Sequence, residues 1–321
     1  MTDTPAAGLA RTVAVINGKG GVFKSSIVSS VGGLLAEAGW RVLLIDADIQ
    51  GNLAEDLGLA EVTDEGRHQL DVIPSGLPLH PVTSGRERLD VVCGGELLED
   101  LDAVMSGRQS RDPQWMHGLA KSIDAVQDDY DLVLIDCPPG FPILQTMALV
   151  ASRYVVIPTR SDSGSRKGMR AVARRFEAAR AYNPDLELLG VVRTGITKSA
   201  KRIRDEVRRE IQDDLGGSAP VFQSVIRYAE GAAKTVRDLG KLPHELEPDI
   251  DRLERARLQR LGERKRREKL ATKGGKRKAD PSEEAEITLT PSLGGVAQDY
   301  AELTQEFLDL LTSAEEGVES A

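Results

Sequence analysis

The sequence predicts an α/β protein with a doubly wound, mostly parallel sheet and helices on both faces, and three observations support this prediction. Short apolar segments alternate with longer segments of helical periodicity over most of the chain. Two of these apolar segments, 41–46 and 131–136, end in an aspartate. A third, at 12–16, leads into a glycine-rich turn that is followed by a helical pattern. Continuous apolar runs of this length are typical of parallel strands, which are buried on both faces.

The expected elements follow from this alternation. Strands are expected at residues 12–16, 41–46, 70–73, 89–92, 131–136, 154–157, 186–192 and 221–226. Helices are expected from residue 25 to about 35 and at 97–105, 114–127, 161–181, 199–215, 230–239 and 296–311. Residues 55–69 are polar and weakly patterned, so no element is assigned to them.

The charge of the chain is unevenly distributed. The net charge is −9, yet residues 252–278 hold 13 Lys and Arg against three Glu, and residues 279–321 hold 11 acidic residues and no basic one. An acidic total therefore does not exclude a nucleic-acid partner. We expect a flexible leader at 1–10, one α/β domain at 11–250, a charged low-complexity insertion at 251–292, a helix at 293–312 that packs on the domain, and an acidic flexible tail at 313–321.

Composition also limits where the protein acts. The two cysteines, Cys93 and Cys137, are too few for a disulfide framework and are expected to be buried thiols in a reducing cytosol. The leader lacks an apolar core, so it is not a signal peptide. No run approaches the roughly 18 apolar residues of a membrane span. We therefore expect a soluble cytoplasmic protein with no membrane partner.

The glycine-rich turn has the composition of a phosphate-binding loop. A strand, a glycine turn and a helix follow one another, so backbone N–H groups and the helix N-terminus converge on an anion. Lys24 would reach the terminal phosphates and Ser25 would bind Mg²⁺. Phe23 departs from the general pattern, because a glycine usually precedes the lysine. The expected nucleotide-binding residues are Gly18, Lys19, Gly20, Gly21, Val22, Phe23, Lys24, Ser25 and Ser26.

Carboxylates follow two of the expected strands. Asp46 and Asp48 lie at the end of the second strand and Asp136 ends the strand at 131–136. The carboxyl ends of parallel strands meet at one edge of a doubly wound sheet, beside the phosphate-binding loop. An aspartate at the tip of an apolar strand is the form that orients Mg²⁺ in nucleotide-hydrolysing enzymes.

Lys19 and Lys24 stand five residues apart in the arrangement K-G-G-x-x-K-S, which resembles the deviant Walker A motif of the ParA/MinD family of P-loop ATPases. The segments L-L-I-D-A-D-I-Q-G-N-L and D-L-V-L-I-D-C-P-P-G are also similar to that family, and the resemblance covers roughly residues 11–245. Among its members, the plasmid and chromosome partition ATPases are nearest. Ile49 replaces the proline usual in the family, and the basic segment 252–278 is foreign to its pattern.

The resemblance implies a role for each matching residue. Lys24 would neutralise phosphate charge in its own protomer and Lys19 would do so across a dimer interface. Ser25 and Asp136 would hold Mg²⁺, with Asp46 beside them at the metal. Asp48 would position and polarise the attacking water.

The implied function is an ATP-dependent partition ATPase that hydrolyses ATP slowly without a partner. ATP and Mg²⁺ would join two protomers into a homodimer that binds duplex DNA without sequence preference on the nucleoid. A ParB-like centromere-binding protein would trigger hydrolysis. One alternative is a MinD-like positioning ATPase, which the acidic C-terminus disfavours. The other is a nucleotide-gated DNA- or protein-binding module impaired in hydrolysis, for which Phe23 is the only support.

Overall fold

The computed structural model describes residues 11–196, 208–213, 219–248 and 292–319. An eight-stranded sheet runs in the order β3-β4-β2-β5-β1-β6-β7-β8, and every pair is parallel except β3 with β4. The predicted α/β fold class is confirmed. The strands are β1 (Thr12–Val15), β2 (Val42–Asp46), β3 (Val82–Thr83), β4 (Leu89–Val92), β5 (Leu132–Asp136), β6 (Tyr154–Thr159), β7 (Glu187–Thr194) and β8 (Val221–Ile226).

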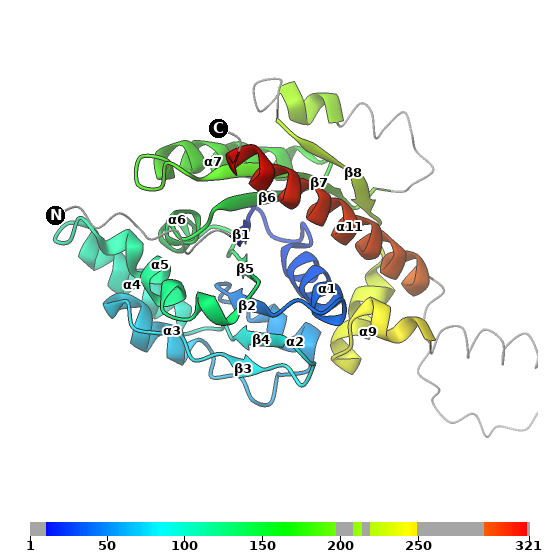
Figure 1. The fold of residues 1–321 in the computed structure, drawn as a ribbon, viewed down its shortest axis with the longest axis horizontal. Helices are drawn as coiled ribbons and strands as arrows, with labels where there is room; N and C mark the ends of the chain where they lie inside the picture. Colours follow the sequence, from blue (N-terminus) through cyan, green and yellow to red (C-terminus); the bar gives the residue numbers. More distant parts are fainter. Residues whose placement is uncertain (1–10, 197–207, 214–218, 249–291, 320–321) are drawn as a thin grey trace, which may run out of the picture.

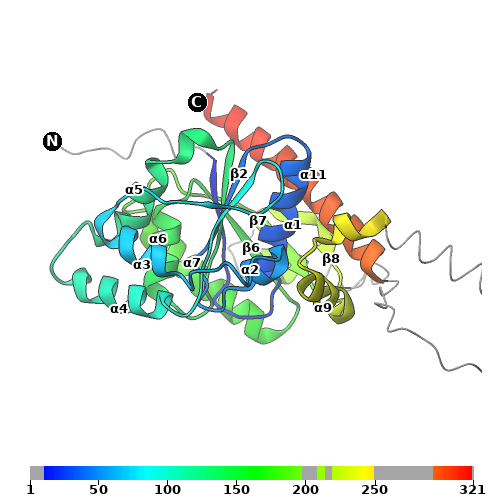
Figure 2. The same cartoon turned by 90° about the horizontal axis from the view of Figure 1, so that it is seen from below.

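Helices cover both faces of the sheet, as Figures 1 and 2 show. One face carries α3 (Arg67–Val72), α4 (Leu98–Gln109), α5 (Gly118–Asp124), α6 (Pro142–Val150) and α7 (Ser163–Ala179). The other carries α1 (Lys24–Glu37), α2 (Asn52–Leu57), α9 (Glu230–Leu239) and α11 (Ser292–Glu319). The described residues also contain three short 3₁₀ helices, η2 (Ile73–Ser75), η3 (Trp115–His117) and η4 (Gln127–Asp129).

Each face of the sheet forms its own apolar core. Along β1 and the residue after it, Ala14 and Ile16 belong to the core under α3–α7, whereas Val13 and Val15 belong to the core under α1 and α11. Successive side chains of a strand point to opposite faces, so a strand that is buried on both sides must be apolar throughout. The continuous apolar runs seen in the sequence are the consequence.

The strand order brings the predicted site together. Strand β5 lies between β2 and β1, so Asp136 is the cross-strand partner of Asp46 on one side and of Val15 on the other. The loop that follows Val15 therefore begins beside Asp136. This is the carboxyl edge of the sheet, where the sequence predicted the site.

Several local predictions differ from the structure. The strand expected at 70–73 is wrong, because this run lies in α3 and the first residue of η2. Helices α2 and α6 and the two-residue strand β3 were not expected. Of the helix expected at 199–215, residues 208–213 are helical and the remainder lies outside the described residues. Most of the 251–292 insertion lies outside them as well, and α11 extends beyond the expected 293–312.

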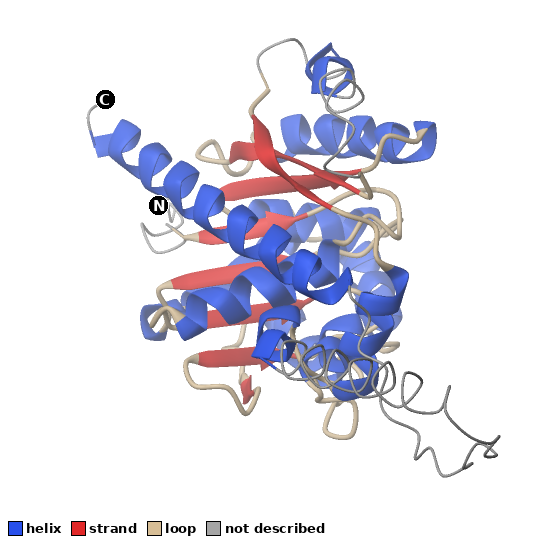
Figure 3. Ribbon diagram, turned by 90° about the vertical axis from the view of Figure 1, so that its right-hand side faces the viewer, coloured by secondary structure: helices blue, strands red, loops and turns tan. Residues whose placement is uncertain are grey.

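Helix α11 lies across the face formed by α1 and the strands (Figure 3) and is fixed there by carboxylates as well as apolar contacts. Buried Asp299 accepts hydrogen bonds from Arg227 through Nε at 2.7 Å, Nη2 at 2.9 Å and the backbone N–H at 3.0 Å. Glu306 accepts from the backbone N–H groups of Gln223 at 2.6 Å and Ser224 at 2.8 Å. The C-terminal helix is thus an integral part of the domain.

We expect Asp299→Ala to destabilise the protein by about 2–3 kcal/mol, because it removes charge-assisted hydrogen bonds from a half-buried guanidinium. Chemical denaturation measured by circular dichroism tests this value. Asp309→Ala is the control on the same helix, since the carboxylate of Asp309 has one described hydrogen bond, from Gln305 one turn away. Equal stability of the Asp299 and Asp309 variants would show that the Arg227 contact does not hold α11.

Candidate functional site

The loop between β1 and α1 approaches helix α7 closely. A Cβ added to Gly18 would lie 3.1 Å from the carbonyl oxygen and 3.2 Å from the Cα of Gly168, so both positions depend on glycine. The side chain of buried Asn17 orders the same turn: its Oδ1 accepts from the N–H of Lys19 at 2.9 Å, and its Nδ2 donates to the carbonyl of Pro158 at 2.7 Å. The loop is therefore positioned by β6 and α7 before any ligand binds.

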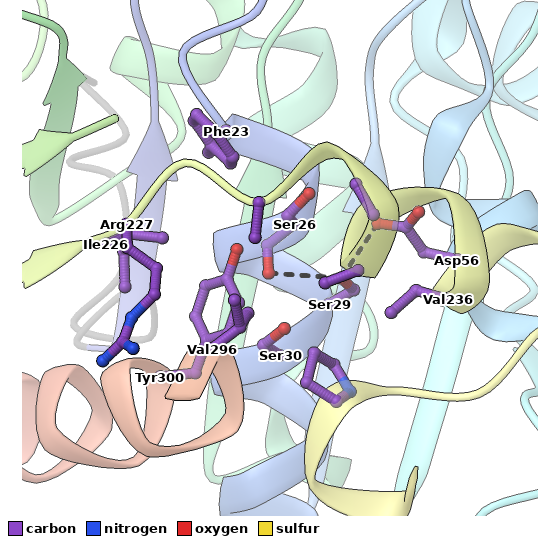
Figure 4. Close-up of a pocket in the computed structure, with 14 residues that line it drawn as sticks. Phe23, Ser26, Ser29, Ser30, Asp56, Ile226, Arg227, Val236, Val296 and Tyr300 are labelled. Carbon is purple, nitrogen blue, oxygen red and sulfur yellow. Dashed lines mark hydrogen bonds between the residues drawn. The ribbon is translucent and has the colours of Figure 1, made fainter. Parts of the chain in front are cut away.

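Phe23 adopts a backbone conformation that favours glycine. Its φ of 69° and ψ of 26° are left-handed, and Phe23 occupies the N-cap of α1 (Figure 4). Such a conformation costs a residue with a Cβ about 1–3 kcal/mol. The ring makes an edge contact with Tyr228 at 6.3 Å between centroids, and Arg160 lies 5.5 Å from the Tyr228 ring centroid. Packing of the ring compensates part of the backbone strain.

The two loop lysines differ sharply in exposure. Lys24 is 5% exposed, and its Nζ donates to the carbonyl of Lys19 at 3.4 Å. The side chain of Lys19 is 41% exposed and its Nζ pairs with Asp162 at 2.5 Å. Asp162 is also the N-cap of α7, where it accepts from the N–H of Ser165 at 3.0 Å. The hydrogen bond from Lys19 keeps the pKa of Asp162 well below its usual range.

Asp136 is the buried anion of the site. Burial raises its pKa to about 7, while the charge of Lys24 and the nearby hydroxyl of Ser25 act in the opposite direction. Neither carboxylate oxygen has a hydrogen-bond partner by geometry among the described residues. A buried carboxylate in this state requires a counterion to ionise, and Lys24 supplies part of that charge.

Asp46 and Asp48 are held in a tight turn after β2. The oxygens of Asp46 accept from the N–H groups of Asp48 at 3.0 Å and Leu53 at 3.1 Å. Burial and then the charge of Asp136 raise the pKa of Asp46 well above its usual value. The carboxylate of Asp48 accepts from the N–H of Gln50 at 3.1 Å, and burial raises the pKa of Asp48. Asp46 therefore orders the turn, and Asp48 is the more available of the two acids.

The residues fit a magnesium nucleotide. Mg²⁺ is usually held by one or two carboxylates together with phosphate oxygens and water. Asp136 offers two buried oxygens that have no hydrogen-bond partner by geometry in the described part of the chain, and the Ser25 hydroxyl lies near it. Within the described part of the chain, no three His, Cys, Asp or Glu side chains form a metal site of their own.

Two residues around this turn were not predicted from the sequence. The buried side chain of Gln69, in α3, donates through Nε2 to the carbonyls of Asp46 at 2.6 Å and Cys93 at 2.8 Å, and so joins the ends of β2 and β4. A Cβ added to Gly94 would lie 2.6 Å from the carbonyl oxygens of both Asp46 and Asp48. Gln69 lies in the unpatterned segment, so only the three-dimensional structure reveals it.

The cysteines take no part in this chemistry. Cys93 and Cys137 are both buried and free, as expected, and burial raises the pKa of each thiol, that of Cys93 to about 11. Both are therefore protonated at neutral pH and poor nucleophiles.

Comparison with known proteins agrees with this geometry. Residues 10–188 match the sequence family described as an AAA domain. The chromosome partitioning protein ParA of Caulobacter vibrioides is 30% identical over 221 residues, which cover 67% of this chain and 80% of that protein. The sporulation initiation inhibitor protein Soj of Bacillus subtilis is 29% identical over 213 residues, 64% of this chain and 82% of Soj. This chain belongs to the ParA/MinD family of P-loop ATPases.

A solved structure similar to this member of the ParA/MinD family contains a bound nucleotide. Cobyrinic acid a,c-diamide synthase from Mycobacterium smegmatis, solved with bound ADP and magnesium, matches with a TM-score of 0.58 and 28% sequence identity. The match covers 72% of this chain and 92% of the synthase. A protein of the same fold therefore binds a magnesium nucleotide, and family membership supports ATPase activity here.

We expect Gln69→Leu to lower the turnover number about tenfold with little change in ATP affinity, because the carbonyl of Asp46 loses its donor and the Asp48 carboxylate moves. Steady-state phosphate release gives kcat and KM separately. Gln127→Leu is the control, since Gln127 is also a buried glutamine, bonded to Asp124 at 2.6 Å before β5. If both variants lost stability and turnover equally, Gln69 would be merely structural.

Proposed function

We propose that this chain is an ATP-dependent DNA partition ATPase that acts as a nucleotide-bridged homodimer. The observation that carries the proposal is the contrast between the two lysines of one loop. Lys24 is buried and its charge acts on Asp136, as we expect of a lysine that serves the nucleotide of its own protomer. The side chain of Lys19, on the same loop, is 41% exposed beside its partner Asp162, so a second molecule can reach it.

The side chains support hydrolysis by positioning and charge neutralisation, which account for most of catalysis in phosphoryl transfer. Lys24 and the N-terminus of α1 would bind the phosphates, while Ser25 and Asp136 would hold Mg²⁺. The metal supplies charge neutralisation when bound. Asp48, fixed by Gln50, would orient the attacking water and accept its proton, a task that its raised pKa favours. Asp46 would maintain the turn rather than bind the metal directly.

Duplex DNA, bound without sequence preference, is the proposed ligand of the dimer. A ParB-like protein is the proposed trigger of hydrolysis. The relatives named as chromosome partitioning proteins support this choice. The basic segment 252–278 lies outside the described residues, so its part in DNA binding remains a sequence-based proposal. Among the described helices, none is both long and apolar enough to cross a bilayer. The exposed side chains of α11 include Glu302 and no Lys or Arg, which disfavours a MinD-like membrane helix.

Gel filtration with ATP, ADP or no nucleotide, repeated with duplex DNA, tests the proposed function directly. A shift to a dimer only with ATP, and comigration with DNA only in that state, is the expected result. A monomer under every condition would contradict the dimer. An ATP-dependent dimer that never comigrates with DNA would contradict the DNA-binding part.

We expect Asp48→Ala to bind ATP and dimerise but to hydrolyse ATP roughly 10²-fold more slowly, the usual loss when an acid–base group is removed. Lys19→Ala is the paired variant. It should bind ATP yet stay monomeric, because the contact that it loses lies across the interface. Phosphate release and gel filtration separate the two effects. Wild-type turnover by Asp48→Ala would show that another group handles the water.

Phe23→Gly is expected to bind ATP at least as tightly as the natural protein, because glycine adopts the left-handed conformation at N-cap without the strain of about 1–3 kcal/mol. Titration with a fluorescent ATP analogue measures the affinity. Phe23→Ala is the matched control, since it keeps the strained Cβ and loses the ring. Clearly weaker binding by Phe23→Gly would mean that the ring is a working part of the site and would favour a specialised, hydrolysis-impaired binding module.

A further inference from the structure

Helix α7 has a strongly basic composition. It contains five basic residues and one acidic residue, Glu177. Arg180 continues the charge as the C-cap. The side chains of the helix itself therefore carry a net positive charge. Exposed cations of one sign are the electrostatic footprint of a polyanion site.

Three of these cations lie on one exposed face, which we call the α7 face: Lys167, Arg170 and Arg174. Their spacing of three and four residues places them one above the other on a helix. All three are exposed, whereas Met169 and Val172 on the opposite side are buried in the core. The helix is thus anchored to the sheet, and the cations are held on a rigid support.

The flanks of the α7 face strengthen its positive potential. Arg175 donates to Gln145, a neutral acceptor, so its charge is not cancelled. Burial, and next the charge of neighbouring Arg174, lower the pKa of Arg175. Arg166, also beside the α7 face, forms an ion pair with Glu210 at 2.8 Å.

We propose that the α7 face binds the phosphate backbone of duplex DNA. The stretch from Lys167 to Arg174 is about 10 Å long at 1.5 Å per residue. Duplex DNA presents about six phosphate charges over that length. The inference rests on the proposed function, and it assigns DNA contact to a helix of the folded domain rather than to the 252–278 segment alone.

Duplex DNA fits this face better than an anionic membrane does. Interfacial helices insert a row of large apolar side chains beside their cations. The exposed positions of α7 include Ala178, Gly164 and the charged residues, and its large apolar side chains are buried or half-buried. Phosphate-backbone binding needs charge and reach without insertion, and it carries no sequence preference.

The triple variant Lys167→Ala/Arg170→Ala/Arg174→Ala tests the α7 face. Binding of the full chain to a fluorescent duplex of mixed sequence is measured by anisotropy with Mg-ATP over a salt series. Each lost phosphate contact should reduce the slope of log affinity against log salt by about 0.9, so we expect a slope smaller by about two to three and affinity at least tenfold lower at moderate salt. Phosphate release without DNA should be unchanged.

The control variant Arg67→Ala/Arg111→Ala/Lys234→Ala removes the same charge from exposed positions outside α7. It should keep the wild-type slope, and an equal loss in both variants would refute a specific role of α7. If the wild-type protein binds DNA and the α7 variant shows the same salt slope, the inference is refuted and the proposed function stands. Failure of the wild type itself to bind would refute DNA binding as a whole. If the α7 variant kept its binding to DNA but lost binding to phosphatidylserine vesicles, the α7 face would be assigned to membranes.

Discussion

The burial of three carboxylates beside one ammonium group is the constraint on which the site depends. Asp46, Asp48 and Asp136 meet at the carboxyl edge of the sheet, and Lys24 is the buried cation among them. Carboxylates in such a place ionise only where backbone N–H groups, cations or a metal stabilise them. The two N–H groups that hold Asp46 and the close approach of Gly94 follow from this requirement. The backbone of the turn after β2 thus compensates part of the buried charge.

The sequence predicted most clearly the strands whose residues are buried on both faces of the sheet. Strands β1, β2 and β5 are buried on both faces, so their apolar runs were unambiguous, as were the aspartates that end β2 and β5. The run at 70–73 holds three apolar residues and Asp71 but belongs to a helix. Four residues cannot distinguish a short strand from one turn of a helix. Helix α6 was not predicted. It begins at Pro142, and proline is well tolerated in the first turn of a helix.

The candidate site likewise contains residues that the sequence predicted and residues that it did not. The loop lysines, Ser25 and Asp136 were recognisable because their chemistry fixes their spacing along the chain. Gln69 and Asp162 act through partners 23 and 143 residues away, and no local pattern encodes such contacts. Asp162 also joins the loop to the helix that bears the α7 face, since it binds Lys19 and caps α7 at once. The loop and that helix are therefore mechanically connected.

The contact of Glu306 with β8 has a consequence for self-association. Strand β8 ends the sheet, and an outermost strand normally presents free backbone donors that can recruit a strand from another molecule. The carboxylate of Glu306 occupies the donors of Gln223 and Ser224 in the middle of this strand. At the opposite end, β3 is only two residues long and offers little to pair with. The two edges of the described sheet thus offer little backbone for edge-to-edge growth, and we expect the described domain to join other copies of itself through side chains and loops.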